Sequence, residues 1–130
     1  MVANTSNSVA LPGDFDAVVE DVRTALGDQG FGVITEIDVQ ATMAEKLGES
    51  YEPYLILGAC NPALAHRAMQ ADPTVATFLP CNVVVRRVGE ATVVEVIDPQ
   101  AMVGFSDAPE LGRVADEVAV GQRERDVQVG

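Results

Sequence analysis

The chain has 130 residues, of which 48% are hydrophobic and 22% charged, and this composition indicates one globular domain rather than a disordered segment. Its apolar runs are shorter than the roughly 20 residues that a membrane-spanning helix requires, so we expect no membrane partner. Twenty acidic residues against eight basic ones give a net charge of −12, which argues against nucleic acid because phosphates would be repelled. The first residues do not form a secretion signal, so we expect a cytoplasmic protein whose two cysteines are thiols.

The first half of the chain predicts strands that alternate with helices. A short strand at 8–11 precedes Asp14, which can cap a helix. The apolar residues of this helix recur at helical spacing, at Phe15, Val18, Val19, Val22 and Leu26. The next segment alternates like a half-buried strand, with Phe31, Val33 and Ile37 on one face and Gly32, Glu36 and Asp38 on the other. A short helix follows over about 40–47 and stops at Gly48.

The second half predicts an inner strand, a helix, a hairpin and a last helix. Residues 54–59 are apolar on both faces, and Asn61 and Pro62 then form a typical helix start. That helix runs to about residue 72 and should bury Leu64, Ala65, Ala68 and Met69. The hairpin pairs 81–88 with 91–97 across Gly89-Glu90, and its inner face carries Val83, Val85, Val94 and Val96. The last helix, over 107–118, should bury Leu111, Val114, Ala115 and Val118.

The predicted order is therefore β-α-β-α-β-α-β-β-α. It indicates an α+β domain with a mixed sheet of about five strands, covered by helices mainly on one face. We expect this single domain to span residues 8–120, with flexible ends at 1–7 and 121–130.

The outer face of the hairpin resembles neither a core nor an ordinary surface. Apolar and charged residues are interleaved on it, namely Val84, Arg86, Val88, Val93, Glu95 and Ile97. Arg86 and Glu95 are close enough to pair diagonally across the two strands. This mixture is typical of an interface, and we predict a homodimer joined partly through this face.

Both cysteines lie at strand boundaries beside an asparagine. The sequence thus predicts a ligand pocket formed by Cys60, Asn61, Pro62, Pro80, Cys81 and Asn82. Cys60 directly precedes a helix N-terminus, which favours a thiolate. Cys81 has the parity of Val83 and should point toward the helices. Whether the two sulfurs meet stays open, because the strand that ends at Cys60 is apolar on both faces.

Metal binding and acid-base catalysis find less support in the sequence. The spacing of Cys60, His66 and Cys81 lacks the close ligand pairs of structural zinc sites, so we predict no metal site and a solvated His66. A soft-metal or haem site completed across a dimer is the alternative. Four carboxylates lie near predicted strand ends, namely Glu36, Asp38, Glu95 and Asp98. They could form a carboxylate pair if these strand ends meet, but we expect them to be solvated rather than catalytic.

Several motifs in order resemble a known family. They include Gly30-Phe-Gly-Val33, Tyr54-Leu-Ile-Leu-Gly-Ala-Cys-Asn-Pro62, Leu79-Pro-Cys-Asn-Val83 and Asp98-Pro99. Over about residues 8–120 they resemble the bacterial and archaeal family catalogued as domain of unknown function 302. The resemblance implies a small α+β domain of the TATA-binding-protein-like type, with a curved sheet and usually a homodimer. It implies neither DNA binding nor a particular activity.

Three functions remain open at this point. The leading hypothesis is a non-enzymatic homodimeric binding module with a small-ligand pocket near Cys60, Asn61 and Cys81. The second is a thiol-active protein for redox chemistry, sulfur transfer or the handling of soft metals or haem. The third is a structural or interaction protein with inert, buried cysteines. The residues specify neither the ligand nor a cofactor.

Overall fold

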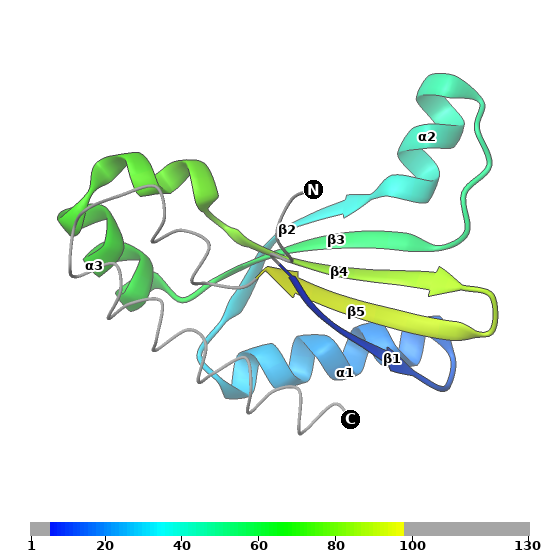
Figure 1. The fold of residues 1–130 in the computed structure, drawn as a ribbon, viewed down its shortest axis with the longest axis horizontal. Coiled ribbons are helices and arrows are strands. Elements are labelled where there is room, and N and C mark those ends of the chain that lie inside the picture. Colours follow the sequence, from blue (N-terminus) through cyan, green and yellow to red (C-terminus); the bar gives the residue numbers. More distant parts are fainter. Residues whose placement is uncertain (1–5, 98–130) are drawn as a thin grey trace.

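The structure is a computed structural model that describes residues 6–97 (Figure 1). The predicted helix at 107–118, Asp98 and the predicted tail at 121–130 lie outside the described residues. In chain order the elements are β1 (Ser6–Leu11), α1 (Phe15–Asp28), β2 (Gly32–Asp38), α2 (Val39–Leu47), β3 (Tyr54–Cys60), α3 (Pro62–Ala71), the short 3-10 helix η1 (Pro73–Phe78), β4 (Cys81–Val88) and β5 (Ala91–Ile97). The predicted α+β class and element order are confirmed over this range, and β1 begins two residues before its predicted start.

The strands form one five-stranded sheet in the order β1-β5-β4-β3-β2. The sequence predicted a mixed sheet, but every neighbouring pair of strands is antiparallel. The helical connection from β1 to β2 does give these two strands the same direction. However, they lie at opposite edges of the sheet with three strands between them, and therefore never pair.

One face of the sheet, here called the inner face, carries the core. Its strand residues are buried, namely Leu57, Ala59, Val83, Val85, Val94 and Val96. Helix α1 lies along this layer, and α3 lies toward one end of the sheet (Figure 1). From α1 come Val18, Val19, Val22 and Leu26, as predicted. In α3 only Ala68 is buried, and Met69 is 39% exposed against expectation. Because α3 lies toward one end of the sheet, a narrower stripe of its surface is buried than the sequence predicted.

The β4–β5 hairpin has the predicted register. Val88 pairs with Ala91, and Gly89 turns the chain with a positive φ of 59°, which favours glycine. Arg87 attaches the hairpin to the turn before α1, since its Nη1 donates to the Gly13 carbonyl oxygen at 3.0 Å and to the Thr92 hydroxyl at 3.1 Å. Thr92 is fully buried, so this bond gives its hydroxyl a partner.

Strand β2 departs from its predicted alternation. Its pairing with β3 shifts between Val33 and Thr35, so Ile34 is an extra residue, a β-bulge. Val33 lies opposite Ala59 on the inner face, but Ile37 lies opposite Ile56 on the other. The expectation that Val33 and Ile37 share a face was therefore wrong, because the bulge reverses the alternation after residue 34.

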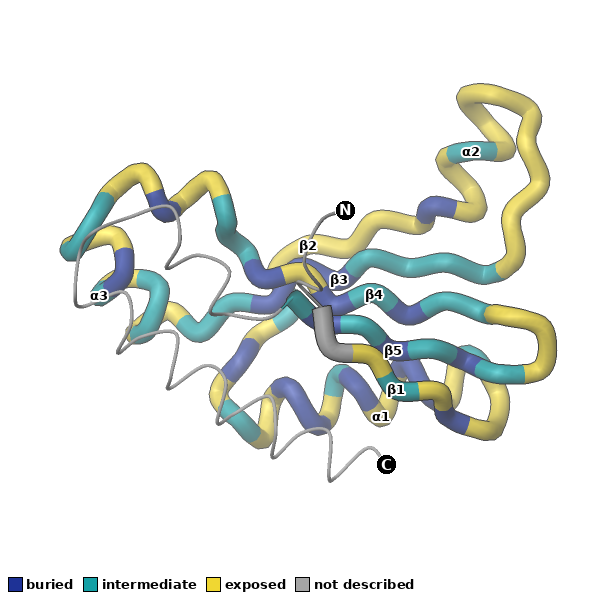
Figure 2. The backbone as a smooth tube through the Cα atoms, in the orientation of Figure 1, coloured by how far each residue is buried: buried dark blue, intermediate teal, exposed yellow. Residues whose placement is uncertain are grey.

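Helix α2 projects from the sheet away from the end that carries α3 (Figure 1). The Asp38 carboxylate caps it by accepting a hydrogen bond from the Ala41 amide at 2.9 Å, and Gly48 ends it with a φ of 67°. Only Val39 is buried, and most of α2 and β2 is exposed (Figure 2). Val33 of β2 packs against the core, but most of this edge of the molecule is open to solvent.

Candidate functional site

The two cysteines lie on opposite faces of the sheet. Cys81 pairs with Ala59 and is buried on the inner face, as its parity predicted. Cys60 follows Ala59 in the same strand and is half-buried on the opposite, outer face. Neither is in a disulfide. Strand alternation thus places the two sulfurs on opposite faces of the sheet, so they do not meet.

Asn61 has a structural role. Its side-chain oxygen accepts a hydrogen bond from the Leu64 amide at 3.2 Å, which caps α3 as predicted. Its amide nitrogen is 3.1 Å from where a Cβ on Gly30 would lie, so the side chain packs against that turn. Pro62 and His66 are exposed on α3. Among residues 6–97 no three His, Cys, Asp or Glu side chains gather closely enough to hold a metal ion.

A hollow of about 540 Å³ lies on the outer face, where the chain passes from η1 into β4. Its described lining comprises Tyr54, Thr77, Phe78, Leu79, Pro80, Asn82, Val84, Glu95, Val96 and Ile97. Two residues of the predicted pocket, Pro80 and Asn82, line it, but Cys60, Asn61, Pro62 and Cys81 are not among the lining residues. The hollow also includes Val84, Glu95 and Ile97 from the predicted interface.

The lining residues of this hollow that were not predicted from the sequence include Tyr54, Phe78 and Leu79. Phe78 and Leu79 form part of the wall, and Tyr54 comes from β3. The one available signal was the apolar pair Phe78-Leu79 directly before Pro80. Tyr54 could not be predicted, because its position depends on the register that places it opposite Arg86.

Gly58 allows this wall to lie close to the sheet. A Cβ at this position would overlap the Thr35 hydroxyl and lie 2.8 Å from Pro80 Cγ. Thr35 and Asn82 pair with Gly58 from the two neighbouring strands. The absence of a side chain at Gly58 therefore makes room for the proline ring that lines the hollow. The Leu79-Pro80 peptide bond is cis.

Glu95, which lines the hollow, forms an ion pair with Arg86 of the neighbouring strand. Arg86 Nε donates to Glu95 Oε1 at 2.6 Å, which confirms the predicted diagonal pairing. The two side chains are 36% and 26% exposed. The hydrogen bond to Glu95 raises the pKa of the Arg86 guanidinium above its ordinary value. The pair therefore contributes one positive and one negative charge and no net charge to this face.

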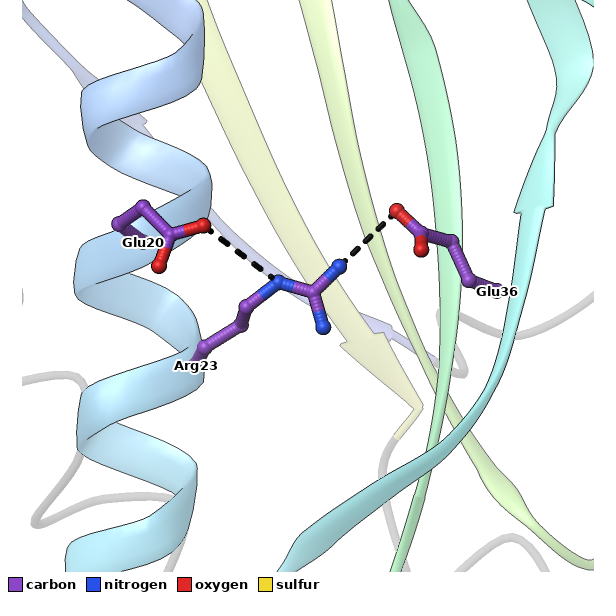
Figure 3. Close-up of polar contacts among 3 residues, drawn as sticks. All are labelled: Glu20, Arg23 and Glu36. Carbon is purple, nitrogen blue, oxygen red and sulfur yellow. Dashed lines mark hydrogen bonds and ion pairs between the residues drawn. The ribbon is translucent and has the colours of Figure 1, made fainter.

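A second hollow, of about 400 Å³, lies between α1 and the β2–β3 edge. Its lining includes Asp16, Glu20, Arg23, Glu36 and Asp38. Arg23 Nη2 donates to Glu36 Oε1 at 2.9 Å, and Arg23 Nε lies 3.8 Å from Glu20 Oε1 (Figure 3). Glu36 thus faces α1 rather than Glu95, and these two carboxylates do not form a pair.

The comparisons with known proteins agree with the motifs. None of the helices between residues 6 and 97 has the length and apolar character needed to cross a membrane. A crystal structure of an uncharacterized conserved protein DUF302 from Bacillus stearothermophilus matches with a TM-score of 0.90 and 26% sequence identity, covering 98% of this chain and 100% of that one. No curated protein is similar enough in sequence to count as a match. The family model described as domain of unknown function DUF302 matches residues 7–125, and the chain therefore belongs to this family.

Proposed function

We propose that the protein is a non-enzymatic, homodimeric binding module that holds a small molecule in the outer-face hollow. The observation that carries this proposal is the hollow itself. Its volume of about 540 Å³ falls within the roughly 300–1,000 Å³ of small-molecule sites. Apolar walls with a few polar groups are also typical of such sites.

The lining supplies the means to orient a ligand. Phe78, Leu79 and Pro80 offer apolar contact along one wall. The Asn82 amide and the hydroxyl groups of Thr77 and Tyr54 can exchange hydrogen bonds with a ligand. Among the described lining residues, the one carboxylate is Glu95, which is paired with Arg86. This lining suits binding and orientation better than proton transfer.

A fluorescence titration with the uncharged probe N-phenylnaphthylamine tests the binding site. We expect saturable binding by the wild-type protein. Val84→Trp should abolish it, because the indole would fill the hollow. Val93→Trp is the matched control, since Val93 is also half-buried on the same face but does not line the hollow. Undiminished binding by Val84→Trp, or equal loss in both variants, would rule out this hollow as the site.

The dimer is the second part of the proposal, and the β2–α2 edge supports it. Large exposed apolar residues concentrate there, namely Ile34, Ile37, Leu47 and Tyr51, which are 61%, 50%, 69% and 42% exposed. Helix α2 has nine residues, and helices shorter than roughly 12–15 residues are marginal without packing. A second copy on this edge would cover these residues, none of which lines the hollow. The hairpin face predicted from the sequence is the alternative surface.

Analytical ultracentrifugation distinguishes the two surfaces. Ile37→Asp should convert a dimer into a monomer, because it would bury a carboxylate in an apolar contact. Val88→Asp places the same charge on the hairpin and should remain dimeric. The reverse result would identify the hairpin face as the interface. A wild-type protein that sediments only as a monomer at micromolar concentration would disprove the dimer.

A further inference from the structure

The charge balance of the hollow constrains its ligand, provided that the hollow is the binding site proposed above. On β3, β4 and β5 the outer face carries two charged residues, Arg86 and Glu95, and they are paired with each other. Glu95 lines the hollow directly. The neighbouring lining residues from these strands are apolar or uncharged, namely Tyr54, Asn82, Val84 and Ile97.

Anions, cations and uncharged ligands would each interact differently with the Arg86–Glu95 pair. An anion would approach the Glu95 carboxylate while the Arg86 Nε is already engaged, in a protein whose net charge is −12. A cation would have to share Glu95 with Arg86. An uncharged molecule leaves the ion pair intact and gains the apolar contact of the Phe78–Pro80 wall.

We infer that the hollow selects uncharged, largely apolar small molecules and that the lining carboxylate of Glu95, held by Arg86, sets this preference by rejecting anions. A floor of extended strands and a wall formed by Phe78 and Pro80 suit a planar ring system. The pair thus acts as a specificity device. It contributes by disfavouring the wrong ligand rather than by attracting the right one.

Two probes with the same aromatic core test this inference. N-phenylnaphthylamine is uncharged, and anilinonaphthalene sulfonate adds one sulfonate to the same rings. We expect the wild-type protein to bind the uncharged probe at least about tenfold more tightly, the ratio expected from one unfavourable charge contact. In Glu95→Gln the guanidinium of Arg86 loses its carboxylate partner. Binding of the sulfonate probe should then rise to within a few-fold of the uncharged probe.

Matched variants separate a local effect from a change in net charge. Glu36→Gln removes the same charge from the Arg23 ion pair beside α1, outside the hollow, and should leave both affinities unchanged (Figure 3). Arg86→Gln leaves Glu95 without its cation and should weaken sulfonate binding further while sparing the uncharged probe. Sedimentation of each variant checks that its assembly state equals that of the wild type.

The outcomes distinguish this inference from the proposed function. Wild-type protein that binds the sulfonate probe as tightly as the uncharged one would overturn the inference but keep the binding site. The same holds if Glu95→Gln gains nothing, or if Glu36→Gln gains as much. Saturable binding of neither probe, in wild type or in Glu95→Gln, would overturn the binding site and the inference together.

Discussion

The β4–β5 hairpin and strand β2 show the same kind of sequence alternation but fold differently. In the hairpin, alternation assigns the faces correctly along both strands, from Val83 and Val96 to the turn at Gly89. In β2 the extra residue Ile34 reverses the faces, so Ile37 leaves the inner face and Glu36 turns toward α1. Alternation therefore predicts the face of a residue only where the pairing is regular.

The difference also separates two kinds of surface. The hairpin is an interior part of the sheet, and its outer residues are mostly half-buried among their neighbours. Strand β2 is an edge strand, and natural edge strands often carry bulges and charges that oppose unwanted pairing. The hollow lies on the regularly paired part of the sheet. The exposed apolar residues lie on the irregular part.

The largest expected effect comes from single-residue deletions in the two regions. Deleting Val84 would turn one half of β4 over and direct Arg86 or Asn82 into the core, so we expect no cooperative unfolding transition. Deleting Ile34 removes only the bulge residue and restores regular pairing of β2 with β3. The free energy of unfolding of this deletion variant should be lower than that of the wild type by about 1 kcal/mol at most. Urea unfolding followed by circular dichroism measures the stability of both deletion variants. An equal loss of stability in the two would show that Ile34 is not an extra residue in β2.

A smaller effect is expected from a methyl group at Gly58. Gly58→Ala forces the added carbon against Thr35 and Pro80 and should cost about 1–3 kcal/mol of stability through overpacking. Gly32→Ala is the control, since nothing lies within 4 Å of its Cβ position. Combining Gly58→Ala with Thr35→Ala should restore part of the loss, because the hydroxyl is the nearer obstacle. An additive loss in the double variant, measured by urea unfolding, would contradict this packing.

The smallest effect concerns reactivity rather than stability. Cys60 is half-buried on the outer face, and Cys81 is buried on the inner face. We expect Cys60 to alkylate faster in the folded protein, because access limits the reaction of a buried thiol. Iodoacetamide labelling of Cys60→Ser and Cys81→Ser, followed by mass spectrometry, measures the two rates. Faster labelling of Cys81 would contradict the assigned faces.

Local signals in the sequence predicted most of the elements. Asp14, Asn61 and Gly89 determine a cap or a turn through their own backbone and side chain, and each was placed correctly. The site depended on pairing between distant segments instead. The bulge at Ile34 and the position of Tyr54 on the hollow follow from strand register, which no local pattern encodes. Two residues of the predicted pocket, Pro80 and Asn82, therefore line the hollow, while its cysteines lie outside the lining.

Amide NMR tests most directly whether the outer-face hollow binds a small molecule. Addition of N-phenylnaphthylamine should shift the amide signals of Asn82, Val84 and Ile97, which line the hollow. The signals of Glu20 and Arg23 beside the second hollow should stay unchanged. Shifts that cluster around α1 or α2, with none on β4 and β5, would contradict the assignment of this hollow as the binding site.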